Sequence, residues 1–169
     1  MKLDIKKILT PGGILLAATV ILGIVSLIIY GVNVSSVGYF QGLGSGAVVA
    51  TGILAVLFGV VAIASSLFHF DGIVGKIVDG LRSVLSILVP VLLMVCLLSF
   101  ISIRAEGLAF IYGSDANALE EVQSPENMAS ASTAITGFIF FGISAIFGIV
   151  ASFFNIPKKE TEAVSEQQA

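Results

Sequence analysis

Charged side chains are missing from a long part of this sequence. No Asp, Glu, Lys or Arg occurs between residues 8 and 70, and only His69 in that stretch could titrate near neutral pH. A helix rises ~1.5 Å per residue, so the ~30 Å hydrocarbon core of a bilayer needs about 20 apolar residues. The uncharged stretch is long enough for two crossings and the turn between them, and it predicts a transmembrane hairpin.

Charge is scarce in the rest of the chain as well. Of the 169 residues, 11% are charged and 57% are hydrophobic, and the mean hydropathy is +1.08. A soluble domain carries ~25% charged residues because water surrounds it on all sides. The net charge is −3, with no basic cluster able to neutralise a run of phosphates. This composition predicts a lipid bilayer as surroundings and excludes nucleic acid as a partner.

Cysteine and histidine occur once each. Cys96 lies in an apolar run and cannot form an intramolecular disulfide, which excludes a disulfide-stapled secreted domain and a cysteine metal cluster. We expect no metal and no cofactor. The lack of external disulfides, together with short loops, favours the cell membrane of a bacterium, the plasma membrane, over the alternative of an organelle membrane.

The apolar residues form four runs that are each long enough for a spanning helix. The sequence therefore predicts an all-α, polytopic membrane protein whose residues 1–157 form a four-transmembrane-helix bundle. Thr10-Pro11 and Ser124-Pro125 are typical helix starts, with a hydroxyl cap followed by a proline. Residues 158–169 have the composition of a disordered tail. The expected spans are 12–31, 46–68, 83–103 and 129–156.

A short charged interval precedes the third span. Lys76, Asp79, Ser83 and Ser86 are spaced 3, 4 and 3 residues apart, which places them on one polar stripe of a long helix. We interpret the stripe as a solvated face whose serines bond to their own helix. Pro90 deprives the carbonyl of Ser86 of its usual helical donor, so a kink is expected there.

The basic residues predict the orientation in the membrane. Seven of the eight fall on one side of the predicted spans, and only Arg104 falls on the other. Because positive charge is retained on the cytoplasmic side, both termini are expected inside the cell. The three tyrosines map to the opposite side, where headgroup-level tyrosines keep a half-buried ring and a wet hydroxyl. The seven are Lys2, Lys6, Lys7, Lys76, Arg82, Lys158 and Lys159.

Catalytic patterns are absent from the sequence. It contains no HExxH, no GxSxG and no phosphate-binding loop ending in Gly-Lys-Ser/Thr. The densest group of chemically active side chains comprises His69, Asp71, Lys76, Asp79 and Arg82, which we interpret as a charged cytoplasmic elbow. The sequence therefore favours a non-enzymatic protein.

Two sets of residues indicate contact with other proteins. Small residues let helices approach closely, which matters in lipid because packing replaces the hydrophobic effect. A polar segment from Arg104 to Ala129 is expected outside the cell, with five acidic residues that could contact a partner. The expected packing residues are Gly46, Ala50, Ala55, Gly59, Gly137, Gly142 and Gly148. The expected partner-contact residues are Glu106, Asp115, Glu120, Glu121 and Glu126.

These features favour an accessory or scaffold subunit that packs with other membrane proteins or with copies of itself as a homo-oligomer. The alternative is a homo-oligomeric channel or transporter subunit. Ion relays rest on ionisable groups inside the spans, and the predicted spans contain none. The hydroxyls at the start of the fourth span, including those of Thr133 and Thr136, are the features that favour a pore.

Overall fold

The computed structural model describes residues 10–68, 72–114 and 119–155, and it is built from helices. The predicted tail, 158–169, lies outside these residues. Four of the helices are long and apolar enough to cross a membrane, so the chain is a multi-pass membrane protein with a four-helix bundle. The helices are α1 (Pro11–Ser35), α2 (Gly46–Leu67), α3 (Gly72–Gly113), the single turn α4 (Leu119–Val122) and α5 (Pro125–Asn155).

Two helices begin where the cap-and-proline pairs predict. Thr10 precedes α1 in an extended conformation, and its hydroxyl accepts a hydrogen bond from the backbone N–H of Gly13 at 3.2 Å. Ser124 precedes α5, and its hydroxyl accepts from the backbone N–H of Asn127 at 3.3 Å. Each hydroxyl satisfies a backbone donor that the first turn of a helix leaves free. The sequence interpretation of both starts is confirmed.

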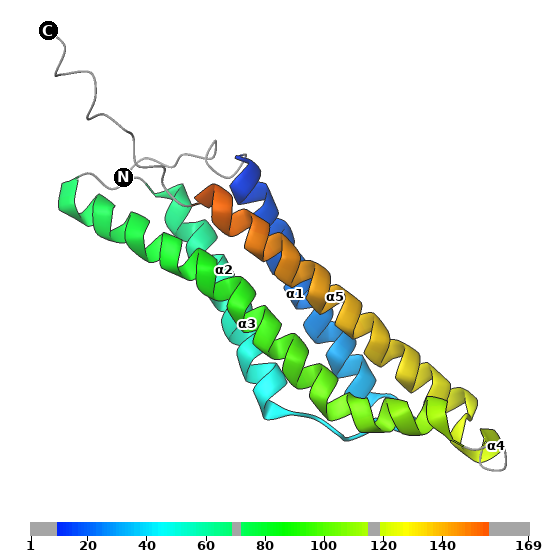
Figure 1. Cartoon of the computed structure of the whole chain (residues 1–169). Helices are drawn as coiled ribbons and strands as arrows, with labels where there is room; N and C mark the ends of the chain where they lie inside the picture. Colours follow the sequence, from blue (N-terminus) through cyan, green and yellow to red (C-terminus); the bar gives the residue numbers. More distant parts are fainter. Residues whose placement is uncertain (1–9, 69–71, 115–118, 156–169) are drawn as a thin grey trace, which may run out of the picture.

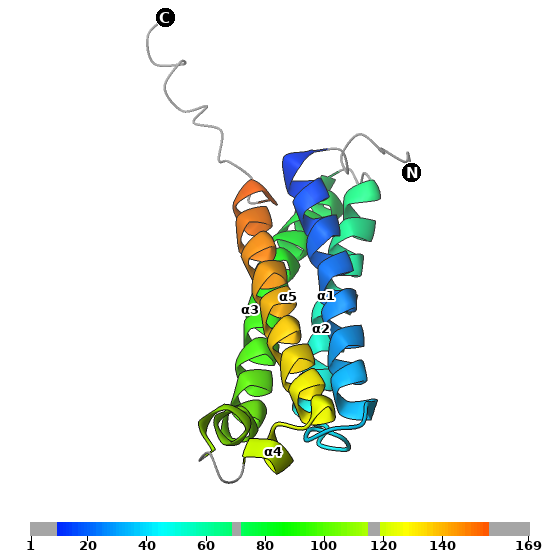
Figure 2. The same ribbon diagram turned by 90° about the vertical axis from the view of Figure 1, so that its right-hand side faces the viewer.

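The four long helices form a ring in which α1 and α3 each contact α2 and α5. Figure 2 shows α1 and α5 side by side along the length of the bundle, with α3 behind α5. Figure 1 shows that α1 begins, α2 ends, α3 begins and α5 ends at one end of the bundle. We call this the elbow end. The opposite end, with residues 36–45 and α4, is called the loop end.

Helix α3 is much longer than the third predicted span. Its 42 residues extend about 63 Å, roughly twice the thickness of a hydrocarbon core. It begins at Gly72, eleven residues before the expected span, and it continues to Gly113, ten residues past Ile103. The stretch from Arg104 to Gly113, expected in a polar loop, is therefore helical. The apolar spacing of Leu108 and Ile111 continues the helix through the polar residues.

Pro90 lies inside α3, and a neighbouring helix supplies the hydrogen bond that it removes. The carbonyl of Ser86 lacks its usual helical donor. The hydroxyl of Ser152 on α5 lies 2.6 Å from that carbonyl and 2.8 Å from the carbonyl of Gly148 on its own helix. A Cβ on Gly148 would lie 3.1 Å from the Cβ of Pro90. The absence of a side chain at Gly148 thus lets α5 approach the proline.

The core lies between the four helices, and the outer surface is apolar. Phe100 on α3 sits at the centre of an aromatic group, with edge-to-face contacts to Tyr30, Phe138 and Phe141 at centroid distances of 4.9, 4.8 and 6.2 Å. Isoleucine, leucine and valine side chains on the outside of the long helices are exposed. This distribution suits a bundle whose surroundings are lipid rather than water.

Candidate functional site

The loop end of the bundle encloses a charged side chain. Arg104, on α3, is 0% exposed and is the largest fully buried side chain in the described part of the protein. From the sequence, Arg104 is expected in an external loop, where it would be the one basic residue on that side of the membrane. It instead points into the bundle, because it shares a helix face with the buried residues Cys96, Phe100 and Ile111.

A chain of hydrogen bonds joins Arg104 to α1, α5 and the loop between α1 and α2. The Nε of Arg104 donates to Oδ1 of Asn33 at 2.9 Å. The Nδ2 of Asn33 donates to the backbone carbonyl of Ser130 at 2.8 Å. The hydroxyl of Ser130 in turn accepts from the backbone N–H of Phe40 at 3.3 Å. Residues separated by up to 97 positions in the sequence are thereby joined at one place.

Aromatic rings cover the guanidinium. Its Cζ lies 4.6 Å from the ring centroid of Phe40 and 5.6 Å from that of Phe100. Rings at such distances attract a cation through the negative charge above their faces. Among the described residues, no carboxylate forms an ion pair with Arg104, and its Nη2 has no hydrogen-bond partner. The positive charge is therefore held by an amide oxygen and two aromatic faces.

The loop of residues 36–45 closes over this cluster because two glycines let it turn. Gly38 and Gly42 have φ angles of 139° and 75°, which favour glycine over other residues. A Cβ on Gly38 would lie 2.6 Å from the carbonyl oxygen of Glu126, so the loop touches the backbone of α5 there. A Cβ on Gly107 would lie 2.5 Å from the ring of Phe40. Glycine is thus required where the loop meets both helices.

Tyr30 departs from the expectation that every tyrosine keeps a wet hydroxyl. It is buried against Phe100. Its hydroxyl hydrogen-bonds to the backbone N–H of Ser45 at the start of α2. The other two tyrosines, Tyr39 and Tyr112, are exposed at the same end. Tyr30 therefore holds the end of the loop, while the other two have the exposure expected at a membrane boundary.

Glu106, Glu121 and Glu126 of the predicted contact segment lie at the loop end too. The described side chains, those of Glu106, Glu121 and Glu126, are exposed. The side chains of Asp115 and Glu120 lie outside the described part. The segment is tied to α3 because Nε2 of Gln123 donates to the carbonyl of Ile111 at 3.0 Å. The three described acidic side chains are thus exposed at the end of the bundle that buries Arg104, and none of them forms an ion pair with it.

The small residues of the predicted packing faces divide into two groups. A Cβ on Gly59 would lie 2.4 Å from Val20 of α1, and one on Gly137 would lie 2.7 Å from Phe100 of α3. Ala55 and Gly148 are also enclosed within the chain. Gly46 and Ala50 are exposed, and Gly142 has only Leu97 nearby, at 3.9 Å. Where a small residue has a very close neighbour, that neighbour therefore belongs to another helix of the same chain.

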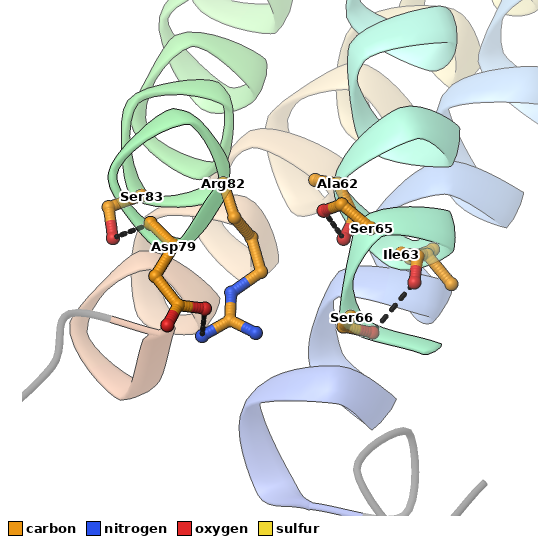
Figure 3. A network of polar contacts seen from close by, with 7 residues as sticks. All are labelled: Ala62, Ile63, Ser65, Ser66, Asp79, Arg82 and Ser83. Atoms are coloured by element: carbon orange, nitrogen blue, oxygen red, sulfur yellow. Dashed lines mark hydrogen bonds and ion pairs between the residues drawn. The ribbon is translucent and has the colours of Figure 1, made fainter. Parts of the chain in front are cut away.

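Two residues of the charged group at the elbow end, Asp79 and Arg82, lie beside each other on α3 (Figure 3). Arg82 and Asp79 form an ion pair at 3.4 Å, with side chains that are 21% and 57% exposed. The hydroxyl of Ser83 donates to the backbone carbonyl of Asp79 at 2.9 Å, as the stripe interpretation predicts. The interpretation is wrong for Ser86, which is 1% exposed and whose hydroxyl has no hydrogen-bond partner among the described residues. His69 and Asp71 lie outside the described residues. A pair with one exposed and one partly exposed partner contributes little to stability.

The described side chains include no group of three His, Cys, Asp or Glu residues that could hold a metal ion. Comparisons with protein-family models, with curated proteins and with solved structures return no match to this chain. The structure adds a buried group that the sequence interpretation lacks, the Arg104 cluster of Asn33, Phe40, Phe100, Arg104 and Ser130. Sequence reasoning missed it because an arginine at the end of an apolar run was assigned to a loop.

Proposed function

We propose that the chain is a non-enzymatic accessory or scaffold subunit of a membrane assembly, and that its loop end recognises a partner protein. The observation that carries this proposal is the construction of that end. Arg104, Asn33 and Ser130 join α1, α3 and α5 through buried hydrogen bonds. Exposed acidic side chains lie at the same end of the bundle. A fixed surface of one charge sign suits recognition of a basic partner.

The orientation that this proposal requires places the loop end outside the cell. Seven of the eight basic residues belong to the elbow-end segments or to the two terminal segments. Arg104, the exception, is buried and so adds no positive charge to the loops at the other end. The difference in loop positive charge between the two sides, on which the positive-inside rule depends, is therefore larger than the sequence count suggests.

Cysteine labelling tests this orientation. In a Cys96→Ala background, we expect a thiol introduced by Ser36→Cys to react with a membrane-impermeant maleimide in intact cells, because Ser36 is exposed at the loop end. A thiol introduced by Ser165→Cys should react only after the cells are opened. The reverse pattern would show that the loop end is cytoplasmic, and the proposed recognition surface would then face the wrong compartment.

The alternative, a homo-oligomeric channel or transporter subunit, rests on the hydroxyls of α5. Thr133 and Thr136 each donate to a carbonyl of their own helix at 2.8 Å. Their oxygen atoms still have lone pairs that could face a pore in an assembly of several copies. Four helices by themselves leave no such path, since the centre of this bundle is filled by Phe100 and Phe141.

One set of variants separates the two functions. We expect the wild-type protein, purified in mild detergent, to have a mass larger than one chain. In a Glu106→Gln, Glu121→Gln, Glu126→Gln variant, the mass of the purified complex should fall and should no longer depend on salt. Complementary charge acts mainly on the rate of encounter, so its removal slows association and thereby weakens binding. An Asp79→Asn variant, altered at the elbow end, should keep the wild-type mass.

Reconstituted liposomes provide the second measurement. The scaffold proposal expects no solute flux above that of empty liposomes. Flux that is present in the wild type and lost in a Thr133→Val, Thr136→Val variant would favour the channel. A monomer without any co-purifying protein, unaffected by the three glutamine substitutions, would contradict the scaffold.

A further inference from the structure

Two aromatic side chains that remain open to other molecules pack against each other at the loop end. The ring centroids of Tyr39, in the loop of residues 36–45, and Phe110, on α3, lie 5.8 Å apart with an interplanar angle of 36°. Their side chains are 37% and 49% exposed, whereas the rings of Phe40 and Phe100 are buried. This ring pair is therefore accessible from outside the bundle.

The ring of Tyr39 is held in place by buried neighbours. It makes an edge-to-face contact with Phe40 at a centroid distance of 5.3 Å, and Phe40 in turn lies on the guanidinium of Arg104 at 4.6 Å. A Cβ on Gly107 would lie 2.6 Å from Cε1 of Tyr39, so the ring rests on the backbone of α3. A ligand of the ring pair would consequently lose little binding energy to the ordering of Tyr39.

The last turns of α3 place a carboxylate beside this ring pair. Figure 1 and Figure 2 show these turns lying across the loop end instead of continuing along the bundle axis. Arg104, Gly107 and Ile111 are buried and mark the side that faces the bundle. Glu106 is exposed and lies four residues before Phe110, so the two Cβ atoms are neighbours about 5–6 Å apart. We call Tyr39, Phe110 and Glu106 the aromatic–acidic patch.

The charge around the patch favours a positively charged ligand. Residues 36–45 and 105–126 together contain five acidic residues and no basic residue. Arg104, the basic residue just before the second segment, is buried. Among the described residues, no ion pair neutralises Glu106. Another molecule must therefore supply the cation that complements this carboxylate.

The combination of rings and carboxylate distinguishes between the two basic side chains of proteins. Aromatic faces attract a cation within about 6 Å, and arginine is found there more often than lysine. A planar guanidinium can stack on a ring while its N–H groups donate to a carboxylate, whereas an ammonium group is a compact point charge. The chain shows the ring contact internally, where Arg104 lies against Phe40 and Phe100. The patch thus suits arginine better than lysine.

We propose that the aromatic–acidic patch binds an arginine side chain of the partner protein, with the guanidinium against Tyr39 and Phe110 and its N–H groups directed at Glu106. The site rests on the proposed recognition function of the loop end and names the side chain that is recognised there. It does not depend on which side of the membrane the loop end faces.

Tryptophan fluorescence tests the site, because the protein has no tryptophan of its own. Tyr39→Trp keeps an aromatic ring in the patch and makes it a reporter. Tyr112→Trp is the matched control, since Tyr112 is 50% exposed on the same helix but lies two residues from Phe110, on another face. The probe is a triarginine peptide with an acetylated N-terminus and an amidated C-terminus, added to the full-length protein in non-ionic detergent.

We expect the emission of the Tyr39→Trp reporter to change along a curve that saturates near one peptide per protein, while the Tyr112→Trp reporter shows no saturable change. Equal responses of the two reporters would show that both aromatic positions only anchor the chain at the headgroup level, and would overturn the proposal. Trilysine should require roughly two- to fivefold more peptide for half-saturation, the factor for one cation–π contact at an exposed site. Equal midpoints for the two peptides would overturn the assignment to arginine.

Substitutions in the Tyr39→Trp background locate the contact. Phe110→Leu and Glu106→Gln should each raise the midpoint for triarginine roughly two- to fivefold. Tyr112→Leu removes an aromatic ring from another face of α3 and should leave the midpoint unchanged. Glu121→Gln removes the same charge from α4 and should shift the midpoint less than Glu106→Gln does. Equal shifts from the two glutamine substitutions would show diffuse attraction to the whole loop end and would overturn the site.

The outcome for this site can be separated from the outcome for the scaffold function. If saturable binding of triarginine is absent, but the purified wild-type complex still loses mass in the triple glutamine variant, the scaffold function stands and the arginine site is wrong. If saturable binding is present and depends on Phe110 and Glu106, but the protein purifies as a lone monomer, the arginine site is supported and the scaffold function is contradicted.

Discussion

Replacing Arg104 by alanine is expected to lower the free energy of unfolding by about 3 kcal/mol or more, the range found when a large buried side chain is truncated. The substitution removes the side chain that fills the space between Phe40 and Phe100. It also leaves the Oδ1 of Asn33 without its donor in a buried position. Thermal unfolding in mild detergent should show a midpoint lower by roughly 6–12 °C.

Two further variants separate packing from hydrogen bonding at Arg104. Arg104→Met keeps an unbranched chain against the two rings but cannot donate to Asn33, so we expect a midpoint between those of the wild type and Arg104→Ala. Arg82→Ala is the matched control, because Arg82 is partly exposed and its ion pair is on the surface. If Arg104→Ala unfolds at the same temperature as Arg82→Ala, the cluster does not hold the loop end together.

The spacing of the buried residues on α3 shows what the sequence could have revealed about Arg104. The buried positions 89, 93, 96, 100, 104, 107 and 111 follow one another at intervals of three or four. This period marks one face of a helix, and Arg104 lies within the series. An arginine at this position nevertheless predicts the end of a span, because an unpaired charge is costly inside a membrane. The Phe40 ring that covers it comes from a loop 64 residues earlier, which no local pattern could indicate.

The helices themselves were predictable because their signals are local. Apolar runs of sufficient length define the spans, and the Thr10-Pro11 and Ser124-Pro125 pairs define two helix starts. Contacts between distant segments were not predictable in this way. The sequence indicates that Pro90 frees the carbonyl of Ser86, but Ser152 could be recognised as its new donor only when α5 is placed beside α3.

The buried polar groups near the elbow end and near the loop end meet the same physical requirement. In lipid, a backbone or side-chain polar group has no water to bond, so a neighbouring helix must supply its partner. Ser152 does this for α3 near the elbow end, and Asn33 does it for Arg104 near the loop end. The hydroxyl of Ser144 donates to the carbonyl of Thr19 at 2.9 Å between them. Helix α5 is thus bonded to α1 or α3 at several levels, which fixes its register.

Gly38 is expected to be the most sensitive position in the loop that covers Arg104. Its φ of 139° disfavours any other residue. A Cβ there would also lie 2.6 Å from the carbonyl oxygen of Glu126 and 2.7 Å from the Cβ of Ser130. In Gly38→Ala the loop must therefore move away from α5. We expect a loss of about 2 kcal/mol or more in the free energy of unfolding, at the upper part of the range for strained backbone positions.

Two other glycines provide controls for Gly38→Ala. Gly42 has a φ of 75°, and no atom lies within 4 Å of the place that a Cβ would take, so Gly42→Ala should show the backbone effect alone, about 1 kcal/mol. Gly31 lies inside α1 with equally open space, and Gly31→Ala should stabilise the helix by roughly 0.5–1 kcal/mol. Thermal unfolding in detergent would rank the three variants.

The loop and the cation should also be coupled. When the loop moves in Gly38→Ala, the ring of Phe40 leaves the guanidinium, and the backbone N–H of Phe40 leaves the hydroxyl of Ser130. A second substitution, Arg104→Ala, then removes an interaction that is already weakened. The loss in the double variant should therefore be smaller than the sum of the two single losses, as is usual for residues in one network. Strict additivity in the unfolding measurements would show that the loop closes independently of Arg104.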